Sequence, residues 1–200
     1  MRGSFLRVLT FVALLLTLSH AAGAQAQPPV TRGLTVALDP VIPTRIEALL
    51  ATPNAVLVTD FYRIDMRFGP SMRIDAVVVE AVETKTRVKG LRVQVRDKEN
   101  RSRQEGTSFI DFDELTKLAR AMNSMAELAS RWAGQDDRQV TELTFTSAGG
   151  FRLAIRQSAR VPRAYLSTGL LDPVVTSIEV GELVTLKLAF EEALAILQRK

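Results

Sequence analysis

Three acidic side chains near the middle of the chain have a spacing that could do chemistry. Asp111, Asp113 and Glu114 stand together in the run FIDFDEL. Paired carboxylates can catalyse glycoside hydrolysis, and carboxylate oxygens can bind calcium. The same residues fit a helix start, because an aspartate cap followed three positions later by a glutamate forms a capping box, and acids in the first turn suit the helix dipole. We interpret the three acids as a helix start, and we predict no catalytic residue and no metal site.

Most other catalytic chemistries lack their residues. The chain has no cysteine, and its one histidine is His20. That histidine lies in a stretch that we interpret as a removable leader. The mature chain then cannot form Ser-His-Asp or Cys-His sites, or zinc sites with nitrogen or sulfur ligands. No P-loop, dinucleotide-binding fingerprint or nucleophile elbow occurs in the sequence. We therefore expect no cofactor.

Residues 1–26 have the pattern of a signal peptide. Arg2 and Arg7 precede an apolar run from Val8 to Leu18, and small residues surround Ala26. The run is shorter than the ~20 residues of a membrane-spanning helix. We expect cleavage near Ala26, with Ala24 as the alternative site, and a periplasmic or secreted mature chain without a transmembrane segment.

The charge of the chain argues against nucleic acid as a partner. The formal net charge is +4, and the leader supplies two of these charges. The small excess that is left is not concentrated in a basic patch of the kind that nucleic-acid binders carry. We expect a protein or small-molecule partner instead.

Alternating apolar and polar residues predict strands, and an apolar residue every three or four positions predicts helices. The first half has predicted strands at Tyr62–Phe68, Met72–Val78, Val88–Arg96 and Gln104–Ile110, then a helix from Asp111 to Trp132 with the stripe Leu115, Leu118, Met122, Met125, Ala126 and Ala129. The second half has strand residues Leu143 and Phe145, a hairpin turn at Gly149–Gly150, strands at Phe151–Ile155, Val161–Thr168 and Val174–Ile178, and a C-terminal helix with the stripe Leu183, Leu186, Phe190, Ala193, Leu194 and Leu197.

The two halves resemble one another. The second helix stripe matches the first at one constant offset, and Gly150–Arg156 matches Gly90–Arg96 at another. We predict an α+β fold in which an antiparallel sheet carries the long helices on one face and a unit of several strands and a helix is duplicated. The units either fuse their sheets about a pseudo-two-fold axis or stand as two separate beads.

These patterns divide the chain into four segments. The segments are a signal peptide at 1–26, an N-terminal strand and short helix at 27–55, a first sheet–helix repeat at 56–133 and a second at 139–200. In the N-terminal segment, Leu34, Val36 and Leu38 alternate, and Pro43 opens the short helix. We expect residues 27–200 to form one domain.

Arginines mark a candidate binding surface. If Tyr62, Leu91 and Phe151 face the helices, the opposite face carries Arg63, Arg67, Arg73, Arg92, Arg96, Arg152 and Arg156. Arginine suits carboxylate and phosphate recognition and is enriched at interfaces. The alternative is an ordinary solvated face, with Asp65 and Asp75 as cross-strand partners. Our candidate binding residues are Arg63, Arg67, Arg92, Arg96, Arg152 and Arg156, and we expect Tyr62, Tyr165 and Trp132 to be packing residues.

The run SFIDFDELTKLARAM, Ser108 to Met122, resembles a segment of small exported bacterial proteins of no established function. In those proteins a strand ending in S-F-I-D leads into D-E-L or D-E-I and an amphipathic helix. The resemblance covers this run only, and the second repeat departs from it. It implies no activity, cofactor or site residue.

Our leading hypothesis is a non-catalytic adaptor of the bacterial envelope that binds another envelope protein through a sheet face or edge. The alternatives are a carrier of a lipid or small apolar ligand between sheet and helices, and a carboxylate-dependent hydrolase. For the adaptor, we expect Arg92→Glu with Arg152→Glu to abolish partner capture without unfolding the chain. A homodimer stays open.

Overall fold

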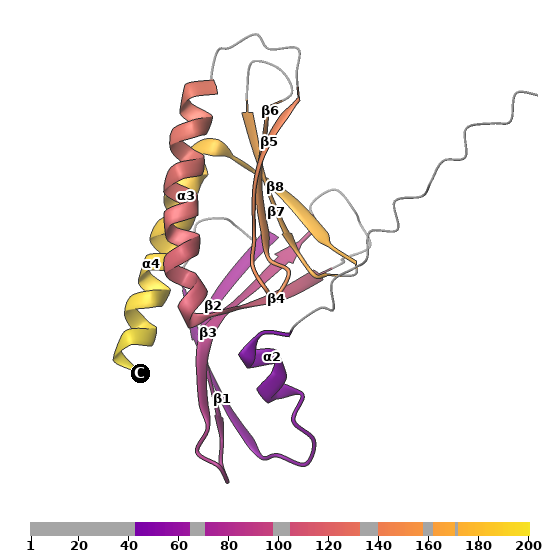
Figure 1. Cartoon of the computed structure of the whole chain (residues 1–200), viewed down its shortest axis with the longest axis vertical. Coiled ribbons are helices and arrows are strands. Elements are labelled where there is room, and N and C mark those ends of the chain that lie inside the picture. The colour runs from indigo at the N-terminus through magenta and orange to yellow at the C-terminus, as the bar shows by residue number, and fades with distance from the viewer. Residues whose placement is uncertain (1–42, 65–70, 98–104, 133–139, 158–161, 171) are drawn as a thin grey trace, which may run out of the picture. The chain divides into compact units, whose positions relative to one another are not determined.

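Strands of the described residues pair into two antiparallel sheets, as the computed structural model of the chain shows (Figure 1). The structure describes residues 43–64, 71–97, 105–132, 140–157, 162–170 and 172–200. The first sheet has the order β1 (Leu57–Arg63), β2 (Met72–Ala81), β3 (Arg87–Arg96) and β4 (Glu105–Asp111), and the second has the order β5 (Thr141–Thr146), β6 (Arg152–Gln157), β7 (Pro162–Thr168) and β8 (Val174–Glu179). The helices are α2 (Arg45–Leu50), α3 (Phe112–Trp132), the 3-10 turn η2 (Val180–Glu182) and α4 (Leu183–Arg199).

The predicted α+β class is confirmed, and so is the repeated unit of strands followed by a helix. Of the two arrangements that the sequence left open, fusion into one sheet is wrong, because within the described residues β1–β4 and β5–β8 pair only among themselves. The alternative of two separate beads is also wrong. Helix α3 contacts strands of both sheets, and α4 packs on β2 and β3 of the first sheet. Each sheet therefore needs a helix from the other repeat, and the two repeats form one folding unit.

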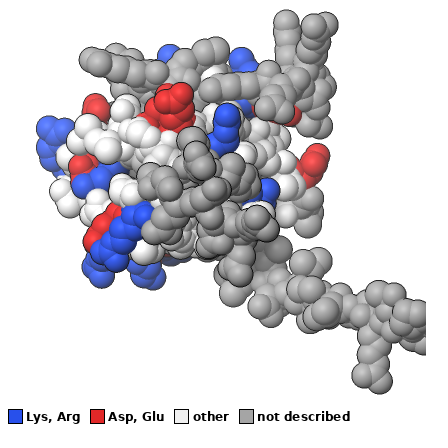
Figure 2. All heavy atoms as spheres, turned by 90° about the horizontal axis from the view of Figure 1, so that it is seen from above, with Lys and Arg blue, Asp and Glu red and all other residues white. Residues whose placement is uncertain are grey.

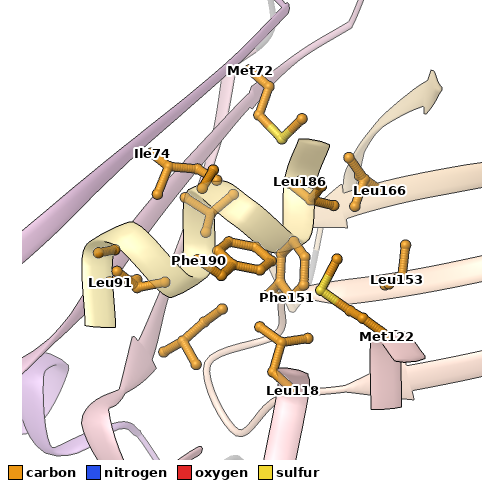
Figure 3. Close-up of a cluster of buried hydrophobic side chains, with 14 of the residues drawn as sticks. Met72, Ile74, Leu91, Leu118, Met122, Phe151, Leu153, Leu166, Leu186 and Phe190 are labelled. Atoms are coloured by element: carbon orange, nitrogen blue, oxygen red, sulfur yellow. The ribbon is translucent and has the colours of Figure 1, made fainter. Parts of the chain in front are cut away.

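One hydrophobic core contains residues of both sheets and of the two long helices. At its centre the ring of Phe151 meets the ring of Phe190 of α4 edge-on, with 6.0 Å between centroids (Figure 3). Figure 3 also shows Leu118 and Met122 of α3 beside Phe151. Burial of one large apolar side chain contributes roughly 1.5–3 kcal/mol, so this core is the main source of stability.

The helix stripes follow the predicted spacing. Helix α3 buries Leu115, Leu118, Met122, Met125 and Ala129, and α4 buries Leu183, Leu186, Ala189, Phe190, Ala193 and Leu197. Two predicted stripe residues, Ala126 and Leu194, are only half-buried.

The predicted match between the strand at Gly90–Arg96 and the strand at Gly150–Arg156 is wrong. Residues 90–96 lie in the third strand of the first sheet, whereas residues 152–156 lie in the second strand of the second sheet.

Glycines set the turn between β5 and β6, as the sequence predicts. Gly150 has φ 75°, and its N–H donates to the carbonyl of Ser147 at 3.1 Å. Gly149 lies so close to the first sheet that an added Cβ would come within 2.0 Å of the Phe109 carbonyl oxygen. The hairpin tip is therefore pressed against β4, which is a second contact between the repeats.

Strand β1 begins earlier than predicted. It starts at Leu57, whereas the alternation from Tyr62 onward had suggested a later start. Each residue from Leu57 to Arg63 pairs with a residue of β2, ending with Arg63 opposite Asp75. The β2 ladder thus extends the strand into a segment whose own alternation is weak. The predicted residues Asp65 and Arg67, the leader, the cleavage site at Ala26 and the strand from Leu34 to Leu38 lie outside the described residues.

Helix α2 covers part of the face of the first sheet that points away from α3 and α4 (Figure 1). We call this side of either sheet its outer face. Ile46 is fully buried there against Val77 and Val79. A Cβ at Gly90 would lie 2.6 Å from the Ile46 side chain, so glycine lets the helix approach the sheet closely. The outer face of the first sheet is therefore only partly open, which the sequence had not indicated.

Candidate functional site

The acid predicted to cap α3 instead binds another helix. Asp111 ends β4 and is buried. Its Oδ2 accepts the backbone N–H of Arg45 at 2.8 Å, and its Oδ1 accepts the N–H of Ile46 at 3.3 Å. Asp113 forms an ion pair with the Arg45 guanidinium. These amides are the free donors of the first turn of α2, so the two acids secure α2 to the first sheet.

Glu114 also has a partner that the sequence did not suggest. Its Oε1 accepts the N–H of Ala148, in the β5–β6 turn, at 3.1 Å. Its Oε2 is buried with no hydrogen-bond partner among the described residues. The predicted capping box with Asp111 is therefore wrong in its partners. In the second repeat, the glutamate at the equivalent position does bind the backbone of the residue before its helix: the N–H of Glu179 donates to the Glu182 carboxylate at 2.8 Å.

The acidic cluster is thus built into the joints of the fold. Asp111 and Asp113 hold α2, while Glu114 holds the tip of the β5–β6 hairpin. A hydrolase needs two acids that converge on one substrate bond. Asp111 and Asp113 are both engaged by Arg45, and Glu114 is engaged by the N–H of Ala148, so the hydrolase hypothesis gains no support from their geometry.

The predicted arginines separate onto two sheets. Arg63, Arg73, Arg92 and Arg96 belong to the first sheet, and Arg152 and Arg156 belong to the second. They do not form one sheet surface, because the two sheets share no strand pairing among the residues that the structure describes. Figure 2 shows basic and acidic side chains next to one another in small mixed groups on the face that it presents.

On the first sheet, the arginines surround a buried carboxylate. The Asp75 side chain is 0% exposed and lies 2.8 Å from Nη2 of Arg92 and 3.0 Å from Nε of Arg73. The Arg92 guanidinium also lies 4.0 Å from the Phe61 ring centroid, and its side chain is only 19% exposed. A buried carboxylate needs such partners, so Arg92 is engaged in holding the sheet together. The predicted cross-strand role of Asp75 is confirmed by its register opposite Arg92.

The two arginines at the margins of this sheet are more exposed. Arg96 pairs with Glu105 across β3 and β4, at 3.0 Å from its Nη2. Arg63 is exposed and forms no ion pair within the described residues. The exposed arginines of this sheet therefore stand at separate positions of its outer face, on β1 and β3.

On the second sheet, Arg152 and Arg156 share one carboxylate. Glu142 of β5 accepts from Nη2 of Arg152, and from both Nε and Nη2 of Arg156 at 3.0 and 2.8 Å. The arginine side chains are 49% and 52% exposed, whereas that of Glu142 is 25% exposed. Two half-exposed guanidiniums thus have one shared counter-ion. One positive charge is left uncompensated within this group.

A hollow of about 320 Å³ lies over these residues. We call it the arginine hollow, and its lining residues are Glu142, Arg152, Ala154, Arg156, Tyr165, Ser167 and Val175. All of them point away from α3 and α4, because they alternate with core residues such as Leu153 and Leu166. The hollow therefore combines two cations with an aromatic ring and apolar walls.

Electrostatics keep Glu142 ionised. Its pKa is lowered from the ordinary value of 4.5, chiefly because Arg156 donates hydrogen bonds to the carboxylate, although partial burial acts in the opposite direction. Thr144 and the charge of Arg152 add smaller effects in the lowering direction. At neutral pH the group is an ion triad that fixes both arginine side chains.

Sequence reasoning missed Glu142, Ala154 and Tyr165. Tyr165 was expected in packing, but it is half-buried on the outer face, with the Arg156 guanidinium 5.9 Å from its ring centroid. The registers of β5 with β6 and of β6 with β7 identify them, since Glu142 stands opposite Arg156 and Ala154 stands opposite Tyr165. The sequence alone does not reveal which strands pair.

No family model matches this chain, and no curated protein matches it. Among the described residues, no group of three or more histidine, cysteine, aspartate or glutamate side chains is placed to hold a metal ion. Helices long and apolar enough to cross a membrane are likewise missing from the described part of the chain. The candidate site therefore rests on its own geometry.

Proposed function

We propose that this chain is a non-catalytic binding protein of the bacterial envelope that acts as an adaptor through the outer face of its second sheet. The arginine hollow is the observation that carries the proposal. It places two half-exposed arginines and a tyrosine on one patch. Arginine and tyrosine are enriched at protein interfaces and among the residues that dominate binding energy.

The position of the patch supports a role in recognition. Solvated faces of antiparallel sheets are common, so polar exposure alone means little. This face differs because one carboxylate serves two guanidiniums and a hollow lies between them. The signal-peptide pattern of residues 1–26 supports action outside the cytoplasm, where an exported partner would be met.

Photo-cross-linking in the native host tests the proposal. Benzoylphenylalanine would replace Thr146, which is exposed on β5 and pairs with Arg152. The same group at Glu83, exposed in the turn between β2 and β3, is the matched control. We expect a defined adduct from position 146 and none from position 83, with the partner identified by mass spectrometry. The same adducts from both positions, or none from either, would contradict the proposal.

A carrier is the second candidate, because a groove of about 840 Å³ lies between the end of α3, the paired ends of β7 and β8, and the start of α4. Ala126, Ala129, Ile178, Val180 and Val184 form its apolar wall, and Arg163, Glu179 and Glu182 are among its polar residues. Its volume lies in the ~300–1,000 Å³ range of ligand pockets. The groove lies between strands and helices, where the carrier hypothesis places a ligand, and it is open to the surface.

Native mass spectrometry of the chain purified from its own host tests the carrier. A bound mass of lipid or metabolite size that is lost in Ala126→Phe, which narrows the groove, would favour it. The unliganded mass alone would eliminate it and leave the adaptor.

A further inference from the structure

A small residue makes the arginine hollow. Along β6, Arg152, Ala154 and Arg156 point to the outer face, because alternate residues of a strand share a side. Ala154 stands between the two long side chains, opposite Thr144 on one neighbouring strand and Tyr165 on the other. Its methyl group forms a low floor, so the guanidiniums rise on both sides of a depression. Substitution of Ala154 alone should therefore change the shape of the site and leave its charge unaltered.

The two guanidiniums have N–H groups that no acceptor among the described residues uses. The hydrogen bonds of Arg152 use Nη2, and those of Arg156 use Nε and Nη2. Arg152 Nε and both Nη1 groups donate to no acceptor in the described part of the chain. A guanidinium binds a carboxylate through two parallel N–H groups, which a half-exposed side chain can present to a second molecule. The site can therefore accept another carboxylate without giving up Glu142.

Charge favours an anion here. Within its described strands, the outer face of the second sheet carries Arg152, Arg156 and Arg163 against Glu142 and Glu179, an excess of one positive charge. Arg156 also stands directly opposite Arg163 in the register of β6 and β7. Like charges in opposite positions destabilise a strand pair, and a bound anion would relieve that repulsion.

The walls of the hollow fit a carboxylate on a short apolar stem. Tyr165 and Val175 lie beside the arginines and supply ring and aliphatic surface. An aspartate or glutamate side chain matches this pattern, with methylene groups against the wall and oxygens toward the guanidiniums. Glu142 holds both arginines before a partner arrives, which reduces the entropy that binding must remove.

We propose that the arginine hollow is a subsite for an aspartate or glutamate side chain of the partner, so that the partner contributes an acidic segment. This inference rests on the adaptor function proposed above. It adds the chemistry of the contact and the residues that make it. A matched glutamine in the partner should bind about tenfold more weakly, because a hydrogen bond between two charged groups is replaced by one with a neutral acceptor.

The first test needs no partner. The full chain, labelled with ¹⁵N, is titrated with the blocked peptide Gly-Ser-Glu-Ser-Gly and with its glutamine counterpart, and the arginine Nε–Hε signals are followed by NMR. We expect saturable shifts at Arg152 and Arg156 with the glutamate peptide, and an affinity about tenfold lower with glutamine. Equal affinities, or shifts spread over all exposed arginines, would overturn the proposal.

Three variants sharpen this test. Arg152→Gln with Arg156→Gln should abolish the response, and so should Ala154→Leu, which fills the hollow and keeps its charges. Arg120→Gln makes the same chemical change at an exposed position of α3 and should leave the response unaltered. Circular dichroism checks that each variant is folded. A response that survives Ala154→Leu would reduce the contact to general electrostatic attraction and overturn the proposed subsite.

Cross-linking from Thr146 separates the two proposals. If the partner is captured and capture survives in the double arginine variant and in Ala154→Leu, the adaptor function holds and the carboxylate subsite is wrong. If no partner is captured from position 146, the adaptor function fails whatever the peptides show.

Discussion

Asp111, the last residue of β4, accepts the backbone N–H of Arg45, 66 positions earlier in the chain, at 2.8 Å. The acid that the sequence assigned to its own helix thus caps the first turn of another one. Thr44 and Glu47 complete the same helix start with a local capping box. Helix α2 has only six residues and would be unstable alone. Its stability therefore depends on this distant carboxylate and on the burial of Ile46.

Asp111→Ala should lower the free energy of unfolding by about 1–2 kcal/mol, the usual cost of losing a helix cap. Urea denaturation followed by circular dichroism measures it. Asp113→Ala is the matched control, because Asp113 pairs with Arg45 in an exposed position. Such pairs contribute at most about 1 kcal/mol. A larger loss in Asp113→Ala than in Asp111→Ala would contradict the capping role.

The shared core predicts one unfolding transition. Phe190 of α4 packs on Phe151 of the second repeat, within a core that also contains residues of the first sheet. We expect Phe190→Ala to cost about 3–5 kcal/mol, and Leu188→Ala, exposed on the same helix, to cost little. Fluorescence of Trp132 and far-ultraviolet circular dichroism should give the same midpoint in urea. Two separate transitions would mean that the repeats fold independently.

Arg92 should matter more to stability than Arg152. Arg92→Gln removes one of the two arginines that hold the buried Asp75, and breaking a buried pair costs a few kcal/mol. Arg152→Gln weakens a half-exposed pair and should cost at most about 1 kcal/mol. Urea midpoints of the two variants provide the measurement. A cost for Arg92→Gln no greater than that of Arg152→Gln would show that Asp75 does not need this partner.

The same contact corrects an expectation from the sequence. Arg92→Glu would set a second carboxylate against Asp75, so the double variant with Arg152→Glu would lose stability as well as any binding. Arg152→Gln with Arg156→Gln is the cleaner test of the surface.

Acid should weaken the ion triad around Glu142. Because its pKa in the folded chain is below the ordinary 4.5, the triad stabilises the fold above that pH, and the stabilisation is lost as pH falls through the folded pKa. We expect Glu142→Gln to be less stable than the native chain at pH 7 by up to about 1 kcal/mol. This difference in stability should shrink progressively as the pH falls below 4.5. Urea midpoints of both proteins across this range measure it, and a difference that grows on acidification would be the opposite result.

The spacing of residues in the sequence predicted those features of the fold that depend on neighbouring residues alone. The α3 stripe through Leu118 and Met122 and the turn at Gly150 follow from spacing and from the conformational freedom of glycine. Strand pairing was not predictable, because residues 90–96 and 152–156 have similar sequences and yet occupy different places in their sheets. The position of a strand in its sheet is therefore decided by the strands that pair with it, and not by its own residues.

The site shows the same division. Arg152 and Arg156 were identifiable as outward residues from the alternation along one strand. Glu142 and Tyr165 were not, because their relation to the arginines depends on the registers in which β6 pairs with β5 and with β7. Asp75 shows how such a prediction can mislead. In the sequence, an arginine that binds a buried acid, as Arg92 does, looks the same as one that is free to bind a partner.

The most direct measurement is the affinity of the native chain for the partner captured from position 146, compared with that of the Arg152→Gln, Arg156→Gln double variant. Biolayer interferometry at two salt concentrations gives both dissociation constants and their salt dependence. We predict binding at least about tenfold weaker in the folded double variant, with a smaller salt dependence, because two charge-assisted contacts are lost. An unchanged dissociation constant would show that the partner does not use this face.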